Sequence, residues 1–248
     1  MKKLLFPILV LVATAAVQAQ TADDILAKYF ENTGGVAKWQ ALQGVKMTAK
    51  LSQMGMEIPI TMVQMRDGRQ ATLINFQGKE IKQGVYDGTT LWSHNFMTMK
   101  AEKSDSESTE NFKLTAMDFP DPFFEYQKKG YKVELLGKET VEGAECFKIK
   151  LTKKPIKVDG KPQDNISFYF FDANDYVPIM VETEISSGQA KGMTSQSKMS
   201  DYTEVGGMLF PFTMTQGVKG GQSQPITISA IELNPKVETS LFALPADK

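Results

Sequence analysis

Two pairs of carboxylates lie close enough in the sequence to act together as a general acid and a general base. Asp118 and Asp121 are three residues apart in "MDFPDP", and Glu182 and Glu184 are two apart in "VETEIS". Such pairs can hydrolyse glycosides and related substrates. However, Glu182 and Glu184 share one face of a strand pattern, as solvated residues do, and Asp121 followed by Pro122 is typical of a helix start. A carboxylate-based hydrolase is therefore left open but not favoured.

Other residues that could carry chemistry are scarce. Cys146 is the only cysteine and His94 the only histidine, whereas zinc sites and Ser-His-Asp or Cys-His catalysis need convergent sets of such residues. We therefore expect no metal, no cofactor and no catalytic residue, and a chain that is not an enzyme. Lys and Arg number 28 against 29 Asp and Glu, a net charge of -1. This balance lacks the basic footprint of a nucleic-acid-binding protein.

The N-terminus has the pattern of a secretory signal peptide. In "MKKLLFPILVLVATAAVQAQ", two lysines precede an apolar run from Leu4 to Val12, and small residues lead up to Ala19. The run is too short to span a bilayer, and no cysteine near the cleavage site could carry a lipid anchor. We expect cleavage after Ala19, which removes residues 1–19 and leaves a soluble periplasmic protein of residues 20–248. That length suits a single domain, and we expect a monomer.

The elements that would position any site are mostly β-strands. Thr21 can cap a short helix that ends before Gly34 and Gly35, and its apolar stripe comprises Ile25, Leu26, Tyr29 and Phe30. From Val45 onward, alternating runs are separated by turns such as "RDGR", "YDGTT" and "VEGAE", which are typical of antiparallel hairpins. The pattern predicts about eleven antiparallel strands and no βαβ crossover.

One segment in the middle of the chain interrupts the strand pattern. "KSDSESTEN" is polar and acidic, so we expect a solvated loop there. It leads to "DPFFEYQKKG", in which Asp121 and Pro122 can begin a helix that Gly130 ends. A short helix that carries Phe123 and Phe124 must lie on an apolar surface.

Methionine is unusually frequent in "MTAKLSQMGMEIPITMVQM", residues 47–65, where strands would normally prefer Val and Ile. Strand alternation places one set on a single apolar face: Val45, Met47, Leu51, Met56, Ile58, Ile60 and Met62. Methionine fills irregular space and repacks around varied partners. The stretch is therefore either ordinary core filling, which it favours when taken alone, or a wall that adapts to a guest molecule.

Several motifs occur in the order found in one known family. They are "VYDGTTLWSHN", "GKETVEGAECFKIKLT", "FYFFDANDYVPIMVETE", "SDYTEVGGMLFPFTMT" and "ISAIELNPKVETSLFALP". The chain resembles the outer-membrane lipoprotein-sorting family, the LolA-like carriers, over nearly all of its length after the signal peptide. The resemblance implies a half-closed antiparallel β-barrel with an N-terminal helix and a mid-chain helical lid. It also implies that the apolar concavity binds lipoprotein acyl chains or a similar lipid, received from an inner-membrane donor and passed to an outer-membrane acceptor.

Strand alternation and the aromatic mid-chain segment, read with this resemblance, indicate which residues form the site. The lipid-binding cavity would be lined by Val45, Met47, Leu51, Met56, Ile58, Ile60, Met62, Trp92 at the rim, Phe119, Phe123, Phe124, Phe168 and Phe170. Arg66 matches the place of an inward arginine that controls the empty and filled states in the family, although it adjoins the "RDGR" turn and a solvated position is the alternative. An envelope protein that binds another hydrophobic ligand would fit the same residues.

Overall fold

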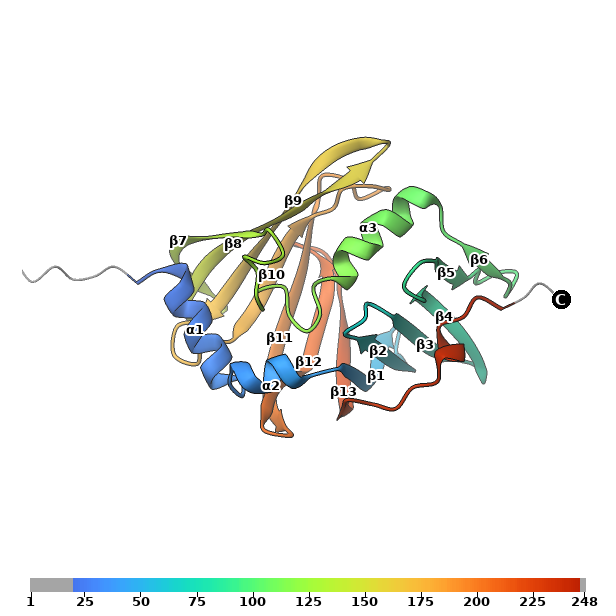
Figure 1. Ribbon diagram of the computed structural model, residues 1–248, viewed down its shortest axis with the longest axis horizontal. Helices are drawn as coiled ribbons and strands as arrows, with labels where there is room; N and C mark the ends of the chain where they lie inside the picture. The colour runs from blue at the N-terminus through green and yellow to red at the C-terminus, as the bar shows by residue number, and fades with distance from the viewer. Residues whose placement is uncertain (1–19, 246–248) are drawn as a thin grey trace, which may run out of the picture.

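The structure is a computed structural model that describes residues 20–245, so the predicted signal peptide lies outside the described residues. A long curved sheet has α-helices beside it (Figure 1), and the described residues form three of them. The strands are β1 (Gly44–Gln53), β2 (Met56–Met65), β3 (Gln70–Phe76), β4 (Lys79–Tyr86), β5 (Leu91–His94), β6 (Ala101–Lys103), β7 (Lys132–Val141), β8 (Ala144–Val158), β9 (Lys161–Asp172), β10 (Pro178–Glu184), β11 (Thr194–Val205), β12 (Met208–Val218) and β13 (Ser223–Leu233).

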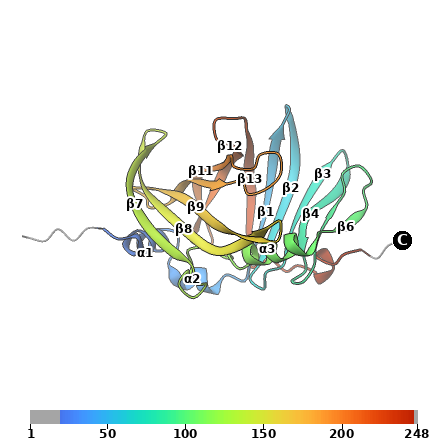
Figure 2. The same ribbon diagram turned by 90° about the horizontal axis from the view of Figure 1, so that it is seen from above.

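All thirteen strands belong to one antiparallel sheet whose order is β6-β5-β4-β3-β2-β1-β13-β12-β11-β10-β9-β8-β7. The sheet curls into a half-barrel, but β6 and β7 stay unpaired with each other at its two edges (Figure 2). The expected half-closed antiparallel barrel is therefore confirmed. The strand number is higher than eleven because β5 and β6 are only four and three residues long, too short for alternation to reveal them.

The first helix forms as its sequence signals predict. In α1 (Ala22–Asn32) the Thr21 side chain accepts from the backbone N–H of Asp24, and the Asp24 carboxylate accepts from that of Thr21, which completes a capping box. The predicted stripe of Ile25, Leu26, Tyr29 and Phe30 is buried. A second short helix, α2 (Val36–Ala41), follows directly and buries Trp39. The two helices cover one end of the half-barrel (Figure 1).

The mid-chain helix lies earlier than the sequence suggested. The predicted loop contains most of α3 (Ser106–Ala116), whose N-cap Asp105 accepts from the backbone N–H of Ser108. Residues 117–130, the aromatic turn segment, form consecutive turns instead of the predicted helix. There the Asp121 carboxylate accepts from the N–H of Phe123 at 2.8 Å and starts a turn. Asp105 is a good N-cap, but it stands in a polar, acidic stretch whose composition is typical of a loop. In the aromatic turn segment, burial of the rings outweighs the local preference for a helix.

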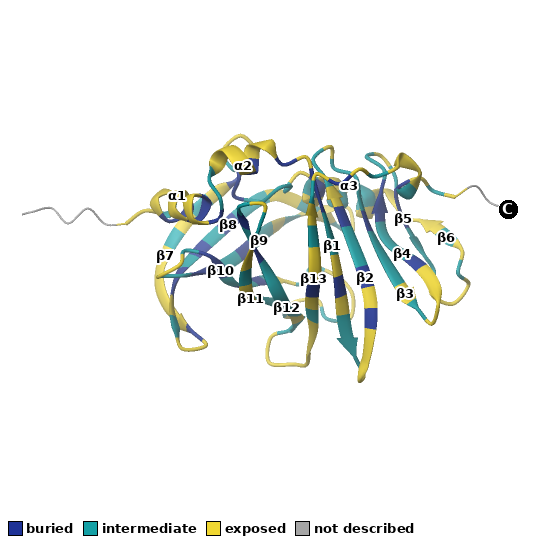
Figure 3. Ribbon diagram, turned by 90° about the horizontal axis from the view of Figure 1, so that it is seen from below, coloured by how far each residue is buried: buried dark blue, intermediate teal, exposed yellow. Residues whose placement is uncertain are grey.

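The register of the sheet confirms the predicted alternation in β1 and β2. Met47 pairs with Met62, Ala49 with Ile60, and Leu51 with Ile58, so their side chains share one face. Figure 3 shows buried bands on β1, β2 and β13. This face is the concave one, because the helices that span the half-barrel pack on it. Within residues 20–245, no helix is long and apolar enough to cross a membrane.

Candidate functional site

The concave face has a closed part at the end where α1 and α2 lie. Here the aromatic turn segment fills the half-barrel: Phe123 and Phe124 are buried, and the ring centroid of Phe123 lies 4.6 Å from that of Tyr169 and 5.5 Å from that of Phe171. Val45 belongs to the same cluster, and Phe119 packs against it. In the structure these rings pack together into a hydrophobic core.

The other part of the concave face is an apolar surface that nothing in the described chain covers completely. We call it the open trough. Its buried floor is Ala49, Ile58, Ile60 and Ile228, and its partly exposed walls are Met47, Leu51, Met62, Ile74, Phe76, Phe212, Met214, Ile226 and Ile231. Met47 and Ile231 also pack against the closed part, so the two parts form one continuous apolar face.

The walls from β3, β12 and β13 were not among the predicted site residues. Phe212 and Met214 alternate within "MLFPFTMTQ", and Ile226 and Ile228 within "ITISAIEL". The same alternation that was followed along β1 and β2 would have found them. What the sequence alone does not contain is the pairing of β1 with β13, which brings Leu51 opposite Ile226.

The helix α3 reaches across the mouth of the half-barrel. On one side the ring of Phe112 lies 5.4 Å from that of Tyr86 in β4. On the other side Asn111 both donates to the carbonyl of Lys157 in β8 and accepts from its N–H, at 2.7 and 2.8 Å. The Glu107 carboxylate accepts from two N–H groups of the β8–β9 turn. α3 therefore has the position of a lid, which the prediction had given to the aromatic turn segment.

Arg66 holds the C-terminal end of α2. Its Nε donates to the carbonyl of Leu42 at 2.6 Å, and one terminal nitrogen donates to the carbonyls of Trp39 and Gln40 at 2.9 and 3.0 Å. These carbonyls have no partner inside the helix and carry the negative end of its dipole. The guanidinium carbon also lies 6.0 Å from the ring centroid of Phe119. Arg66 is thus half-buried between α2 and the aromatic turn segment, and the solvated alternative does not hold.

A partly buried polar network anchors the aromatic turn segment. The Asp118 carboxylate accepts from the Tyr131 hydroxyl and pairs with the Lys153 ammonium, both at 2.8 Å. The Asp121 carboxylate accepts from the hydroxyl of Tyr29 in α1 at 3.0 Å. Burial raises the pKa of Asp121 to about 6. Both aspartates considered as an acid–base pair are thus engaged in fastening the segment to α1 and β8.

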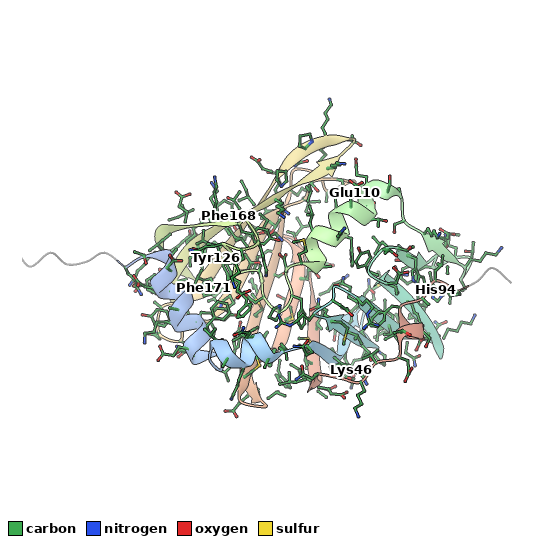
Figure 4. All side chains as sticks on the ribbon, viewed as in Figure 1. Lys46, His94, Glu110, Tyr126, Phe168 and Phe171 are labelled. Atoms are coloured by element: carbon green, nitrogen blue, oxygen red, sulfur yellow. The ribbon has the colours of Figure 1, made fainter. Side chains whose placement is uncertain are left out.

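The other candidate chemical groups lie away from the trough. Glu182 points from the opposite face of β10, where it pairs with Lys219 at 2.8 Å and accepts from Gln196 at 2.9 Å. Cys146 is buried in β8, and burial raises the pKa of its thiol to about 11. His94 (Figure 4) accepts a backbone N–H through Nδ1. No group of three or more His, Cys, Asp or Glu side chains in residues 20–245 could hold a metal ion.

Three predicted cavity residues lie on the convex face, so their assignment was wrong. Phe168 and Phe170 point outward, where the Lys148 ammonium lies 5.6 and 5.1 Å from their ring centroids. The concave face takes Tyr169 and Phe171 instead; Phe168 and Phe171 are labelled in Figure 4. Because β9 has aromatic rings on both faces, alternation alone could not decide which set pointed inward.

Trp92 is the third misplaced residue. It is fully buried under the C-terminal segment, and its indole N–H donates to the carbonyl of Phe242 at 2.9 Å. Trp92 shares its strand face with both polar and apolar residues, so the sequence suggested a position at the rim of the cavity. The segment that covers Trp92 lies 150 residues later in the chain, and the local pattern contains no sign of it. Met56 keeps the predicted face but is 47% exposed beside the β1–β2 turn, outside the trough.

The architecture is similar to that of several proteins of known structure. No protein-family model matches the sequence, and no curated protein matches it. The structure is similar to that of a LolA superfamily protein from Nitrosomonas europaea, with a TM-score of 0.54 and 14% identity over 91% of this chain and 98% of that one. The chain has the LolA fold. An outer-membrane lipoprotein-sorting protein domain from Vibrio parahaemolyticus is similar too, with a TM-score of 0.53 and 13% identity over 88% of this chain and 94% of that one.

A DUF1329 family protein from Desulfovibrio piger is also similar to this chain, with a TM-score of 0.53 and 14% identity over 88% of this chain and 97% of that one. Because identity is this low, the likeness shows the LolA fold alone. This chain matches nearly the whole length of each of the three similar structures. The open trough lies on the concave side of its half-barrel.

Proposed function

We propose that this chain is a carrier that holds an acyl chain, from a lipoprotein or a similar lipid, against the open trough. The observation that carries the proposal is a concave face with nine partly exposed apolar side chains in its walls. Each CH2 group removed from water contributes about 0.8 kcal/mol. About eight such groups would contribute roughly 6 kcal/mol before the cost of ordering the ligand.

The methionines suit this ligand. An acyl chain is mobile and has no polar feature along its length, so a rigid complementary wall has little to recognise. Met47, Met62 and Met214 can change rotamer as the chain slides or leaves. Adaptable walls thus support both holding and releasing such a chain. The methionines would fill space in the apolar face and also adapt to a bound molecule, so the two interpretations of the methionine-rich stretch are compatible.

The direction of transport is the finer part of the proposal. The signal-peptide pattern and the family resemblance support an exported protein that receives its cargo from an inner-membrane donor and delivers it to an outer-membrane acceptor. The names of the similar structures, a LolA superfamily protein and a lipoprotein-sorting protein, agree with this direction. We propose a periplasmic location for the same reasons.

Arg66 is proposed as the gate. In the structure its three hydrogen bonds hold α2 at the end of the trough. An acyl chain that extends into the closed part would displace α2 or the neighbouring Phe119 and weaken these contacts. The arginine would then favour the empty state and keep the affinity moderate, as hand-over requires.

The binding proposal is tested by titrating a fluorescent palmitate derivative into two variants of the same hairpin. Met62→Glu places a carboxylate in the trough wall, and we expect the affinity to fall about tenfold or more, since an unpaired charge in apolar surroundings is unfavourable. Met54→Glu is the matched control, because Met54 is 92% exposed in the β1–β2 turn. Equal affinities for the two variants would contradict the proposal.

A second experiment identifies the ligand. The chain should be recovered from its native envelope, and co-purified molecules should be identified by mass spectrometry. Acylated peptides would support lipoprotein transport, whereas free lipids would favour a binding protein for another hydrophobic ligand. The hydrophobic side chains of the trough suit a hydrocarbon but would not distinguish one acyl donor from another.

A further inference from the structure

The exposed hydrophobic side chains of this protein gather in three connections between strands. Among residues 20–245, eight large hydrophobic side chains are exposed, and five of these are Met54, Met56, Phe96, Met97 and Met193. The first two belong to the β1–β2 turn, the next two to the β5–β6 connection and the last to the β10–β11 loop. We call these three connections the apolar tips. Single exposed hydrophobic residues need no explanation, but a gathering of them marks a contact surface.

The antiparallel order of the sheet places the three apolar tips on one rim of the half-barrel. β1, β3 and β5 end at this rim, and β2, β4 and β6 start there. Leu51 of β1 pairs with Ile226 near the start of β13, so the ends of β12 and β10 reach the same rim. Figure 3 shows the β1–β2 and β12–β13 ends on the side away from α1 and α2.

The apolar tips follow an arc along this rim and do not form a single patch. Four strand spacings of about 4.8 Å, or roughly 19 Å along the sheet, separate the β1–β2 turn from the β5–β6 connection, and the same number separates it from the β10–β11 loop. The turns between them are polar: the β3–β4 turn is Gln77 and Gly78, and the β12–β13 turn includes Lys219 and Gln222. The arc therefore surrounds the edge of the sheet at which the open trough ends.

Each apolar tip is held in shape by the backbone around it. In the β5–β6 connection the Asn95 side-chain oxygen accepts from the N–H groups of Met97 and Thr98 at 2.9 and 3.1 Å. In the β10–β11 loop the N–H of Ile185 donates to the carbonyl of Met193 at 2.8 Å. Both central residues of the β1–β2 turn have positive φ, as two-residue hairpin turns require. The tips thus present their side chains without burying them, and folding does not explain the choice of Met and Phe there.

Charged residues beside the tips are balanced in sign. Lys50 and Glu57 pair at 2.7 Å next to the β1–β2 turn. Lys100 and Glu102 both follow the β5–β6 tip, and the β10–β11 loop contains one lysine and follows a glutamate. No excess charge therefore selects an anionic or a cationic partner, and the apolar side chains distinguish this rim.

We infer that this rim binds the surface of a lipid bilayer, with the three apolar tips inserted among the headgroups. A bilayer is a continuous plane, so separate tips on an arc can reach it together, and binding grows with the apolar area that enters the interface. A specific protein interface instead buries one contiguous centre, which the polar turns between the tips interrupt. The inference goes beyond the proposed function, because binding to a bilayer does not require a filled trough.

Flotation with vesicles of neutral phosphatidylcholine tests the inference. The chain is used from Gln20 onward, because the apolar run from Leu4 to Val12 would bind lipid by itself. We expect the wild type to float with the vesicles, and its partition to change less than about twofold between roughly 0.1 and 1 M NaCl, since apolar contacts are not screened. Met97→Glu and Met193→Glu should each weaken the partition about fivefold or more.

The matched control lies on the opposite side of the half-barrel. Val36 is 56% exposed but begins α2, so Val36→Glu should bind vesicles like the wild type. A wild type that does not float would overturn the inference, and cross-links from position 97 to an envelope protein would then identify a protein surface as the partner. An equal loss in Val36→Glu, or a tenfold loss at high salt, would also overturn the role of the apolar tips.

Two further measurements separate the rim from the trough. Met62→Glu, which blocks the trough, should float like the wild type; loss of flotation would place the lipid in the trough and overturn the inference. A polarity-sensitive dye on Met97→Cys should shift to shorter wavelength when vesicles are added, and the same dye on Val36→Cys should not. Cys146 is buried and would not take the dye. Failure of the palmitate test alone would leave binding at the rim unaffected.

Discussion

Replacing Arg66 by leucine should slow the release of a bound acyl chain. In the structure the guanidinium donates three hydrogen bonds to carbonyls at the end of α2, two of them partly buried. Leucine cannot make these bonds, so the empty state loses stability. It also adds apolar surface beside Phe119, where an acyl chain could extend. Both effects favour the filled state over the empty one.

The size of the effect follows from the hydrogen bonds. A hydrogen bond to a charged group contributes about 1.5–3 kcal/mol. If filling the trough breaks one of the two partly buried bonds, the variant should bind about 10- to 150-fold more tightly, since each 1.4 kcal/mol is tenfold. The free energy of unfolding of the empty variant should fall by a similar amount, which urea denaturation would measure.

Stopped-flow displacement of the fluorescent palmitate derivative measures the release rate. Most affinity differences between related complexes lie in the dissociation rate, so we expect release from Arg66→Leu to be at least tenfold slower. Arg69→Leu is the control, because Arg69 pairs with Asp67 and Phe242 on the convex side. An unchanged or faster rate in Arg66→Leu would refute the reasoning and leave Arg66 as a helix anchor only.

Three other predictions follow. Burial raises the pKa of Asp121 from 3.8 to about 6, so its stabilisation is complete well below pH 3.8 and is lost as the pH rises to 6. Relative to Asp121→Asn, the wild type should lose about 2 kcal/mol of unfolding free energy between pH 4 and 7, measured in urea. Phe171→Ala should cost about 3–5 kcal/mol and the partly exposed Phe168→Ala about half as much or less, and equal losses would contradict the assignment of faces. Intact-mass analysis should give a chain that begins at Gln20 without a diacylglycerol, and a retained N-terminus would contradict export with cleavage after Ala19.

Alternation predicted the concave side of β1 and β2 because the signal there is redundant. Apolar and polar residues separate cleanly along β1, and Met56, Ile58, Ile60 and Met62 give β2 an unbroken apolar run on one face. The short turn at Met54 and Gly55 fixes the register of the two strands, so Met47 meets Met62. The same rule failed in β9. Phe168 and Phe171 are both apolar, and only the packing of α1 and the aromatic turn segment decides that Phe171 faces inward.

The misplaced mid-chain helix shows a second limit. Local signals for helix formation exist both at Asp105 and at Asp121, and each aspartate does accept a backbone N–H. The helix forms after Asp105, where Glu107 and Asn111 bind the β8–β9 hairpin. After Asp121 the rings of Phe123 and Phe124 must reach a core made by distant strands. Tertiary contacts, which a window of sequence does not contain, thus select between two capping signals of similar strength.

The free edges of the sheet have a consequence for the size of the cargo. In a closed barrel the circumference is set by the number and stagger of the strands, so widening it requires breaking ladder hydrogen bonds. Here β6 and β7 do not pair with each other, and the gap is bridged by side chains of α3, among them Asn111 and Phe112. A change in sheet twist with a small movement of α3 can therefore alter the girth of the half-barrel while every strand keeps its partners. If the chain is the carrier proposed above, such a half-barrel would accept one hydrocarbon chain or several at little elastic cost, and its selectivity for chain number would depend on how firmly α3 is attached.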